Sequence, residues 1–225
     1  IEITDLDSHR LEDGTYKLSY PVNALQMGDY VDLRFYDKDG RQLILLRNNR
    51  RPASYATVSY SVRNYISDAI KSGDEKLADL ANALDNYGNA AENHFLGRQH
   101  KMELSDIDMT DLETYKPAFG TDIAVSLVLG SETSLRLYTD KKNVTINGVG
   151  ATAKTGKYGR YYEIKNIPAH KLMESYTVDA DGTQFTVSPM NYVYKVLDRE
   201  DAPPTLTDVV KALYYYTKAA NAYNS

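Results

Sequence analysis

Apolar residues recur at spacings of three and four in two long stretches of the chain, the period of an amphipathic helix. The first stretch predicts a helix over residues 74–95, preceded by a shorter one over 63–71. The second predicts a helix that begins after Pro203 and Pro204, preceded by a shorter one over 190–197. The apolar stripes are Leu77, Leu80, Leu84, Tyr87 and Ala91, and Leu206, Val209, Leu213, Tyr216, Ala220 and Tyr223. Because an apolar stripe must be buried, we expect each long helix to cover the β-strands of its own half.

The two helical segments repeat one another in sequence. Residues 61–94 recur, with divergence, as residues 188–223. The matched positions include Ser61 and Ser188, Asn64 and Asn191, Tyr65 and Tyr192, Leu77 and Leu206, Leu84 and Leu213, Tyr87 and Tyr216, and Ala91 and Ala220. A repeat of this kind indicates a modular architecture. One position departs: Gly88 is matched by Thr217, and a glycine inside a helix predicts close approach to a neighbouring backbone.

Alternation of apolar and polar residues predicts β-strands ahead of each helical pair. They are residues 15–22, 30–36, 42–46 and 56–60, then 123–129, 134–138, 143–146, 161–164, 175–178 and 184–187. Residues 37–40 and 179–182 have the same type of hairpin-turn sequence. We therefore predict an α+β fold of two tandem units, each a small antiparallel β-sandwich-like sheet followed by a helical hairpin. The units are residues 1–97 and 119–225, and an acidic connector with a strand over 101–104 occupies residues 98–118.

Helix caps can also be predicted from the sequence. Ser72 with Glu75 fits a capping box at the start of the first long helix. Thr205, with Asp208 three residues on, is expected to cap the second.

Composition narrows the class of protein. The chain has 225 residues, 42% of them hydrophobic and 25% charged, which is ordinary for a folded domain. A net charge of −5 argues against a nucleic-acid binder, and the basic run at residues 47–51 is interpreted as a solvated loop. Cysteine is absent, which excludes disulfides and thiolate metal sites. No apolar run approaches the length of about 18 residues that a membrane span needs. The chain opens on Ile1 without a methionine, which we interpret as a piece of a longer protein.

Motifs for catalysis or metal binding are missing from the sequence. The four histidines show no zinc-binding spacing, and the aspartates of the two hairpin turns lack the later glutamate of a calcium loop. The acidic run at 106–111 is interpreted as solvated linker rather than a weak calcium contact. Neither a nucleophile elbow nor a phosphate-binding loop is present, so we expect no enzyme, no cofactor and no metal.

Tyrosine is the outlier in composition, with 20 Tyr against 4 Phe and no Trp. Tyr158, Tyr161 and Tyr162 cluster in a predicted β region, where exposed aromatic rings can stack on sugars. Alternation places Tyr161 and Tyr162 on opposite faces, so at most one of them belongs to the core. Tyr214 and Tyr215 lie mostly off the apolar stripe, and we expect them to contact the other half or a partner.

The order of elements resembles a recurrent module of large secreted or surface proteins of anaerobic Gram-positive bacteria, gut clostridia in particular. The residues that carry the resemblance include Gly14, Tyr60-Ser61-Val62, Tyr65, Leu77, Leu80, Ala83, Leu84, Tyr87-Gly88, Ala91 and Phe95. The resemblance implies an appendage outside the cell or on the cell wall, beside anchors, repeats or glycan-degrading domains. The expected function is a non-enzymatic spacer or adhesion unit, with a carbohydrate-binding module as the alternative. The expected partner is a glycan or another surface protein.

Overall fold

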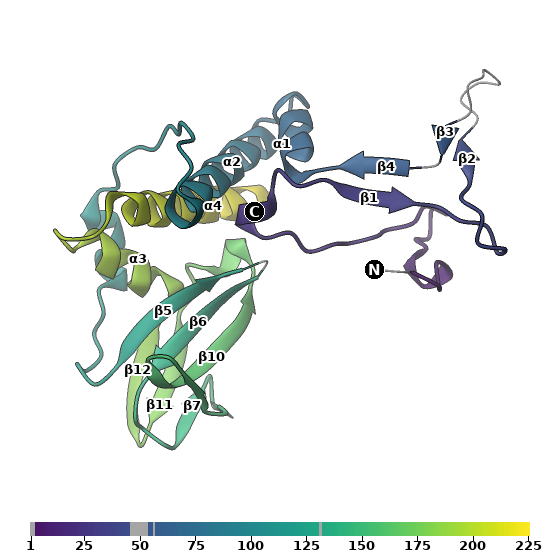
Figure 1. Cartoon of the computed structure of the whole chain (residues 1–225). Helices are drawn as coiled ribbons and strands as arrows, with labels where there is room; N and C mark the ends of the chain where they lie inside the picture. Colours follow the sequence, from purple (N-terminus) through teal and green to yellow (C-terminus); the bar gives the residue numbers. More distant parts are fainter. Residues whose placement is uncertain (1–2, 46–53, 56, 131) are drawn as a thin grey trace.

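The computed structural model describes residues 3–45, 54–55, 57–130 and 132–225 and has an α+β fold (Figure 1). The helices are α1 (Val62–Ile70), α2 (Glu75–Leu96), α3 (Pro189–Leu197) and α4 (Pro204–Asn224). Short 3-10 helices are η1 (Asp7–His9), η2 (Ala24–Gln26), η3 (Met109–Tyr115) and η4 (Ala169–Lys171). The strands are β1 (Val31–Arg34), β2 (Ile44–Leu45), β3 (Ser54–Tyr55), β4 (Thr57–Tyr60), β5 (Ala124–Leu129), β6 (Thr133–Tyr138), β7 (Val144–Ile146), β8 (Val149–Gly150), β9 (Lys154–Gly156), β10 (Gly159–Ile167), β11 (Tyr176–Ala180) and β12 (Thr183–Val187).

The two short helices, α1 and α3, begin with the same cap. Ser61 and Asn64 hydrogen-bond reciprocally at the start of α1, and Ser188 and Asn191 do so at the start of α3. Both helices are nine residues long. Such a box satisfies backbone groups that a helix leaves unpaired in its first turn. The repeated serine and asparagine therefore define the same helix start in both halves.

The caps predicted for the two long helices are wrong. Asp74, not Ser72, caps α2, and its carboxylate accepts a hydrogen bond from the Leu77 amide at 3.1 Å. Helix α4 begins at Pro204, and Thr205 lies inside it with its hydroxyl 2.9 Å from His94 Nδ1. A proline in the first turn has no N–H that needs a cap, so no side-chain cap is required at that position.

Helices α2 and α4 contact each other through residues of their apolar stripes, while Leu77 of α2 packs near α1, so the expectation that each long helix mainly covers its own strands is corrected. The rings of Tyr87 and Tyr216 stack with centroids 5.7 Å apart and planes 9° from parallel. These two tyrosines are matched positions of the repeat. Residues of both halves, including Ala90 and Leu213, belong to one hydrophobic core.

Gly88 lies where α2 approaches the segment that contains η2. A β-carbon at this position would lie 2.7 Å from Met27 Sδ and 3.6 Å from the carbonyl oxygen of Ala24. The close neighbour is therefore chiefly a buried methionine side chain, with backbone somewhat farther away. At the matched position Thr217 is fully buried, and its hydroxyl donates to the Leu213 carbonyl oxygen at 2.8 Å. The two helices therefore pack differently at this point.

The strands of the second half form a sandwich of two antiparallel sheets. One sheet has the order β5-β6-β10-β9, and the other has the order β12-β11-β7-β8. Their facing sides bury Leu135, Leu137, Tyr162, Val178 and Val187. In Figure 1 this sandwich lies below the helices. This part of the fold agrees with the expected β-sandwich-like sheets.

The strands of the first half do not form a sandwich within the described residues. Strand β1 pairs with β4 and β2 pairs with β3, each as a two-stranded sheet. The predicted strand over 15–22 is reduced to a single bridge between Arg10 and Tyr16. Alternation predicts which side of a segment is apolar but not whether a partner strand is available, which explains the difference. Leu46, the basic run 47–51 and Ala56 lie outside the described residues.

Residues 98–118 pack against the helices. The predicted strand over 101–104 is absent from this described segment. Instead η3 forms, with the Leu112 side chain fully buried. The Asn191 side chain of α3 donates to the carbonyl oxygen of Tyr115 at 2.6 Å. This stretch is therefore part of the folded body.

The repeat extends farther toward the N-terminus once the elements are compared. Residues 14–31 align without gaps with residues 159–176, an alignment that pairs η2 with η4 and in which Gly14, Tyr16 and Ala24 are identical to Gly159, Tyr161 and Ala169. Strand β1, its hairpin, β4 and α1 then correspond to β11, its hairpin, β12 and α3. This correspondence decides which surfaces of the two halves can be compared.

Candidate functional site

The three tyrosines predicted to bind a ligand have different environments. Tyr162 is 1% exposed, and its hydroxyl donates to the Lys141 carbonyl oxygen at 2.8 Å. Tyr161 is 9% exposed, and Arg136 covers its ring with Cζ 4.7 Å from the centroid. Tyr158 is 74% exposed in the turn between β9 and β10. Only Tyr158 of the three thus presents an accessible ring.

A nearly buried carboxylate organises the outer face of β6, β9 and β10. Glu163 lies 2.6 Å from Lys154 Nζ and 2.9 Å from Arg136 Nε, while its side chain is 7% exposed. The hydrogen bond from Lys154 holds the pKa of Glu163 below its usual range, against desolvation, which raises it. Sequence reasoning missed this cluster. The only signal was alternation, which placed Arg136 and Glu163 on strands that prove to be neighbours.

Tyr214 and Tyr215, predicted to lie at an interface, contact the chain itself. Tyr214 is 4% exposed. The Tyr215 hydroxyl donates to the carbonyl oxygen of Asp106 at 3.1 Å, and Lys211 Nζ lies 2.6 Å from the Asp106 carboxylate. Tyr215 and Lys211 of α4 therefore hold the acidic stretch 98–118 against this helix through their contacts with Asp106.

Residues 3–45, 54–55, 57–130 and 132–225 contain no group of at least three His, Cys, Asp or Glu side chains placed to hold a metal ion. Over the same ranges, none of the helices combines the length and apolar character needed to cross a membrane.

The β1–β4 pair has one apolar and one polar face. Val31 lies opposite Tyr60 and Leu33 opposite Val58, so these four side chains share one face. Val58 is 48% exposed and Tyr60 43% exposed. The other face carries Asp32, Arg34, Thr57 and Ser59. In Figure 1 the pair projects away from the helices, to the right of the view.

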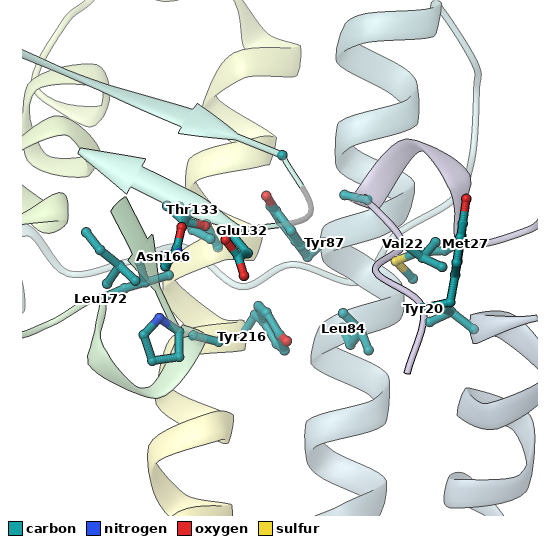
Figure 2. A pocket seen from close by; sticks show the side chains of 17 residues that line it. Tyr20, Val22, Met27, Leu84, Tyr87, Glu132, Thr133, Asn166, Leu172 and Tyr216 are labelled. Atoms are coloured by element: carbon teal, nitrogen blue, oxygen red, sulfur yellow. The ribbon is translucent and has the colours of Figure 1, made fainter. Parts of the chain in front are cut away.

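A pocket of about 500 Å³ lies beside the contact between α2 and α4 (Figure 2). Its lining comes from both halves of the repeat in matched pairs: Val22 and Ile167, Ala24 and Ala169, Met27 and Leu172, Leu84 and Leu213, and Tyr87 and Tyr216. Gly130 and Glu132, which flank the β5–β6 turn, complete one side. The pocket was not predicted, because its residues are spread over the chain and converge only when η2, η4, α2 and α4 pack.

The pocket has polar as well as apolar lining, with Thr133, Asn166 and tyrosines among its residues. Glu132 is the carboxylate among the lining residues, and it forms no ion pair with the part of the chain that the structure describes. Tyr87 is 7% exposed and lines the pocket together with Tyr216. Burial raises the pKa of Tyr87 and of Tyr216, so both remain neutral phenols at physiological pH. The pocket therefore combines apolar side chains with neutral polar groups and one negative charge.

Comparison of the chain with protein-family models, curated proteins and solved structures found no match. The resemblance noted from the sequence thus receives no support from these comparisons, and a functional assignment has to be argued from the geometry described above.

Proposed function

We propose that this chain is a non-enzymatic structural and interaction module, a spacer or adhesion unit of a bacterial secreted or cell-surface protein. In this proposal it consists of two tandem units, residues 1–97 and 119–225, with the acidic connector 98–118 between them. The observation that carries the interaction function is the apolar face of the β1–β4 pair, on which Val58 and Tyr60 are exposed while Val31 and Leu33 are partly buried. The extracellular or wall-attached location rests on the sequence resemblance.

The matched strands of the second half indicate what covers such a face. Val178 of β11 and Val187 of β12 are 0% and 1% exposed, because their side of the sheet packs on the β5-β6-β10-β9 sheet. The corresponding positions of the first half are Leu33 and Tyr60. A two-stranded sheet is marginally stable without such packing. We therefore propose that the β1–β4 face binds the apolar face of another polypeptide's β-sheet, and a second copy of this chain can supply one.

Self-association should reveal this contact. In sedimentation velocity over a wide concentration range, the chain should associate reversibly through the apolar β1–β4 face. Replacing Val58 with lysine puts a charge into that contact, and we expect association to weaken by about tenfold or more, since burying an unpaired charge is costly. Thr57→Lys is the matched control, because Thr57 is also exposed and lies next to Val58 on the polar face. A chain that stays monomeric at every concentration, or equal loss in both variants, contradicts the contact.

Carbohydrate binding is a second candidate function, favoured by the exposed ring of Tyr158. Lys157 Nζ lies 5.1 Å from the centroid of that ring, and Tyr138 meets its edge at 6.4 Å between centroids. An exposed aromatic ring of this kind can pack against the apolar face of a sugar. The burial of Tyr161 and Tyr162 narrows this hypothesis to Tyr158.

Migration through native gels that contain plant or mucin polysaccharides tests the second candidate. Retardation of the wild-type chain should disappear in Tyr158→Ala, because the accessible ring is removed. Tyr223→Ala is the control, since Tyr223 is also exposed but lies at the end of α4. Unchanged migration of the wild-type chain in every gel would leave protein contact as the single candidate.

A further inference from the structure

We propose that the pocket beside the α2–α4 contact binds a small organic cation, in which an ammonium group is attached to an apolar or aromatic body. Sites for small molecules are typically concave, mostly apolar and about 300–1,000 Å³ in volume. The pocket of about 500 Å³ lies within that range. Its walls belong to helices and short 3-10 segments that also build the core, so it is formed before any ligand arrives.

The charge of the pocket selects a cation. Its lining residues include no lysine, arginine, histidine or aspartate, so the Glu132 carboxylate decides the sign of the local field. Because Glu132 has no cationic partner among the described residues, a ligand ammonium can pair with it without displacing another side chain. An anionic ligand would meet the same carboxylate as a repulsive charge.

The aromatic rings favour an ammonium with an attached apolar group. Tyr20, Tyr87 and Tyr216 line the pocket together, with Tyr87 on α2 and Tyr216 on α4 (Figure 2). A cation within about 6 Å of a tyrosine ring is attracted by the negative face of the ring. Leu84, Met27 and Leu172 provide apolar contact for the rest of the ligand.

Tyr87 brings a hydroxyl group to the pocket as well as a ring. Its side chain is 7% exposed, and it is one of the residues that line the pocket. A ligand oxygen, or a water held with the ligand, would be a suitable hydrogen-bond partner for this hydroxyl.

Titration with benzyltrimethylammonium tests the proposal, and the methyl signal of Met27 is the reporter. The chain has five methionines, so isotope-labelled methyl groups give few signals, and Met27→Leu identifies the one in the pocket. We expect the Met27 signal to shift saturably with benzyltrimethylammonium. Benzoate, of similar size but opposite charge, should leave it in place, and neutral benzyl alcohol should bind more weakly than the cation.

A variant that removes the negative charge of Glu132 tests whether the cation binds beside this residue. Glu132→Gln keeps the size of the side chain, and it should weaken binding roughly threefold to fivefold, as expected for a partly solvated ion pair. Glu200→Gln, an exposed change outside the pocket, should leave binding unchanged. Glu132 is itself exposed, so folding should be unaffected, and an unchanged melting temperature confirms this. The proposal is overturned if Met27 does not respond to the cation, if benzoate binds equally well, or if Glu132→Gln binds as tightly as the wild type.

Discussion

Replacing Tyr162 with alanine should lower the free energy of unfolding by about 3–5 kcal/mol, the range for large buried aromatic residues. The ring is 1% exposed between the two sheets of the sandwich, so its removal leaves a cavity that the surrounding β-strands cannot fill without shifting. The change is measured by urea denaturation followed by circular dichroism. For a chain of this size, we expect a fall in melting temperature on the order of 10 °C.

Two variants separate the causes of that loss. Tyr162→Phe removes only the hydroxyl that donates to the carbonyl oxygens of Lys141 and Lys142, and it should cost about 1 kcal/mol. Tyr158→Ala removes the same type of side chain from an exposed turn, and it should change stability by no more than about 0.5 kcal/mol. Equal losses for Tyr162→Ala and Tyr158→Ala would contradict the sandwich described above.

Leu213→Ala should also be severe, with an expected loss of about 2–5 kcal/mol. Leu213 is 1% exposed and lies where α4 meets the rest of the core. Leu84, its match in the repeat, borders the pocket and is only partly buried. Both residues line the pocket, but Leu84 is the less buried of the two and has fewer contacts to lose, so we expect Leu84→Ala to cost about 1–2 kcal/mol. Thermal unfolding of both variants measures the difference, and a larger loss for Leu84→Ala would be incompatible with this packing.

The helices could be predicted from sequence because their signals are local. The stripe of α2 and the cap formed by Ser61 and Asn64 depend on residues within one or two turns of each other. The predicted ranges 63–71 and 74–95 differ from α1 and α2 by one residue at each end. The repeat added support, since two divergent copies predicted the same elements. Capping of α2 and α4 was the exception, because several neighbouring residues could each have served as the cap.

The strands were predicted with uneven success for a physical reason. Alternation correctly placed Tyr161 and Tyr162 on opposite faces of β10, yet it could not decide which face would be buried. That choice depends on the second sheet, whose residues are distant in sequence. The segment 15–22 alternates as well, but within the described residues it forms a single bridge instead of a strand. A strand requires a partner, and no local pattern specifies one.

The candidate sites also differ in how much of their location could be predicted from local sequence. The sequence grouped Tyr158, Tyr161 and Tyr162 without indicating which ring is exposed, whereas the pocket lined by Tyr87, Tyr216 and Glu132 had no local signal at all. Its residues come from η2, α2, the β5–β6 turn, η4 and α4, which converge only in the folded chain. Tyr214 was expected at an interface because it lies off the apolar stripe, but packing against the folded chain buries it.

By itself, the sequence determined where the helices form, which positions repeat and which side of each strand is apolar. Those properties follow from the 3.6-residue and two-residue periods of the backbone, and they involve only near neighbours. The tertiary structure alone decided that α2 and α4 meet through the stacked rings of Tyr87 and Tyr216. It also decided that β11 and β12 bury Val178 and Val187, while the matched face of β1–β4 leaves Val58 and Tyr60 exposed. Each apolar surface can pack against several other apolar surfaces with similar free energy, and long-range contacts decide which of them it meets. The period of a sequence pattern carries no information about that choice.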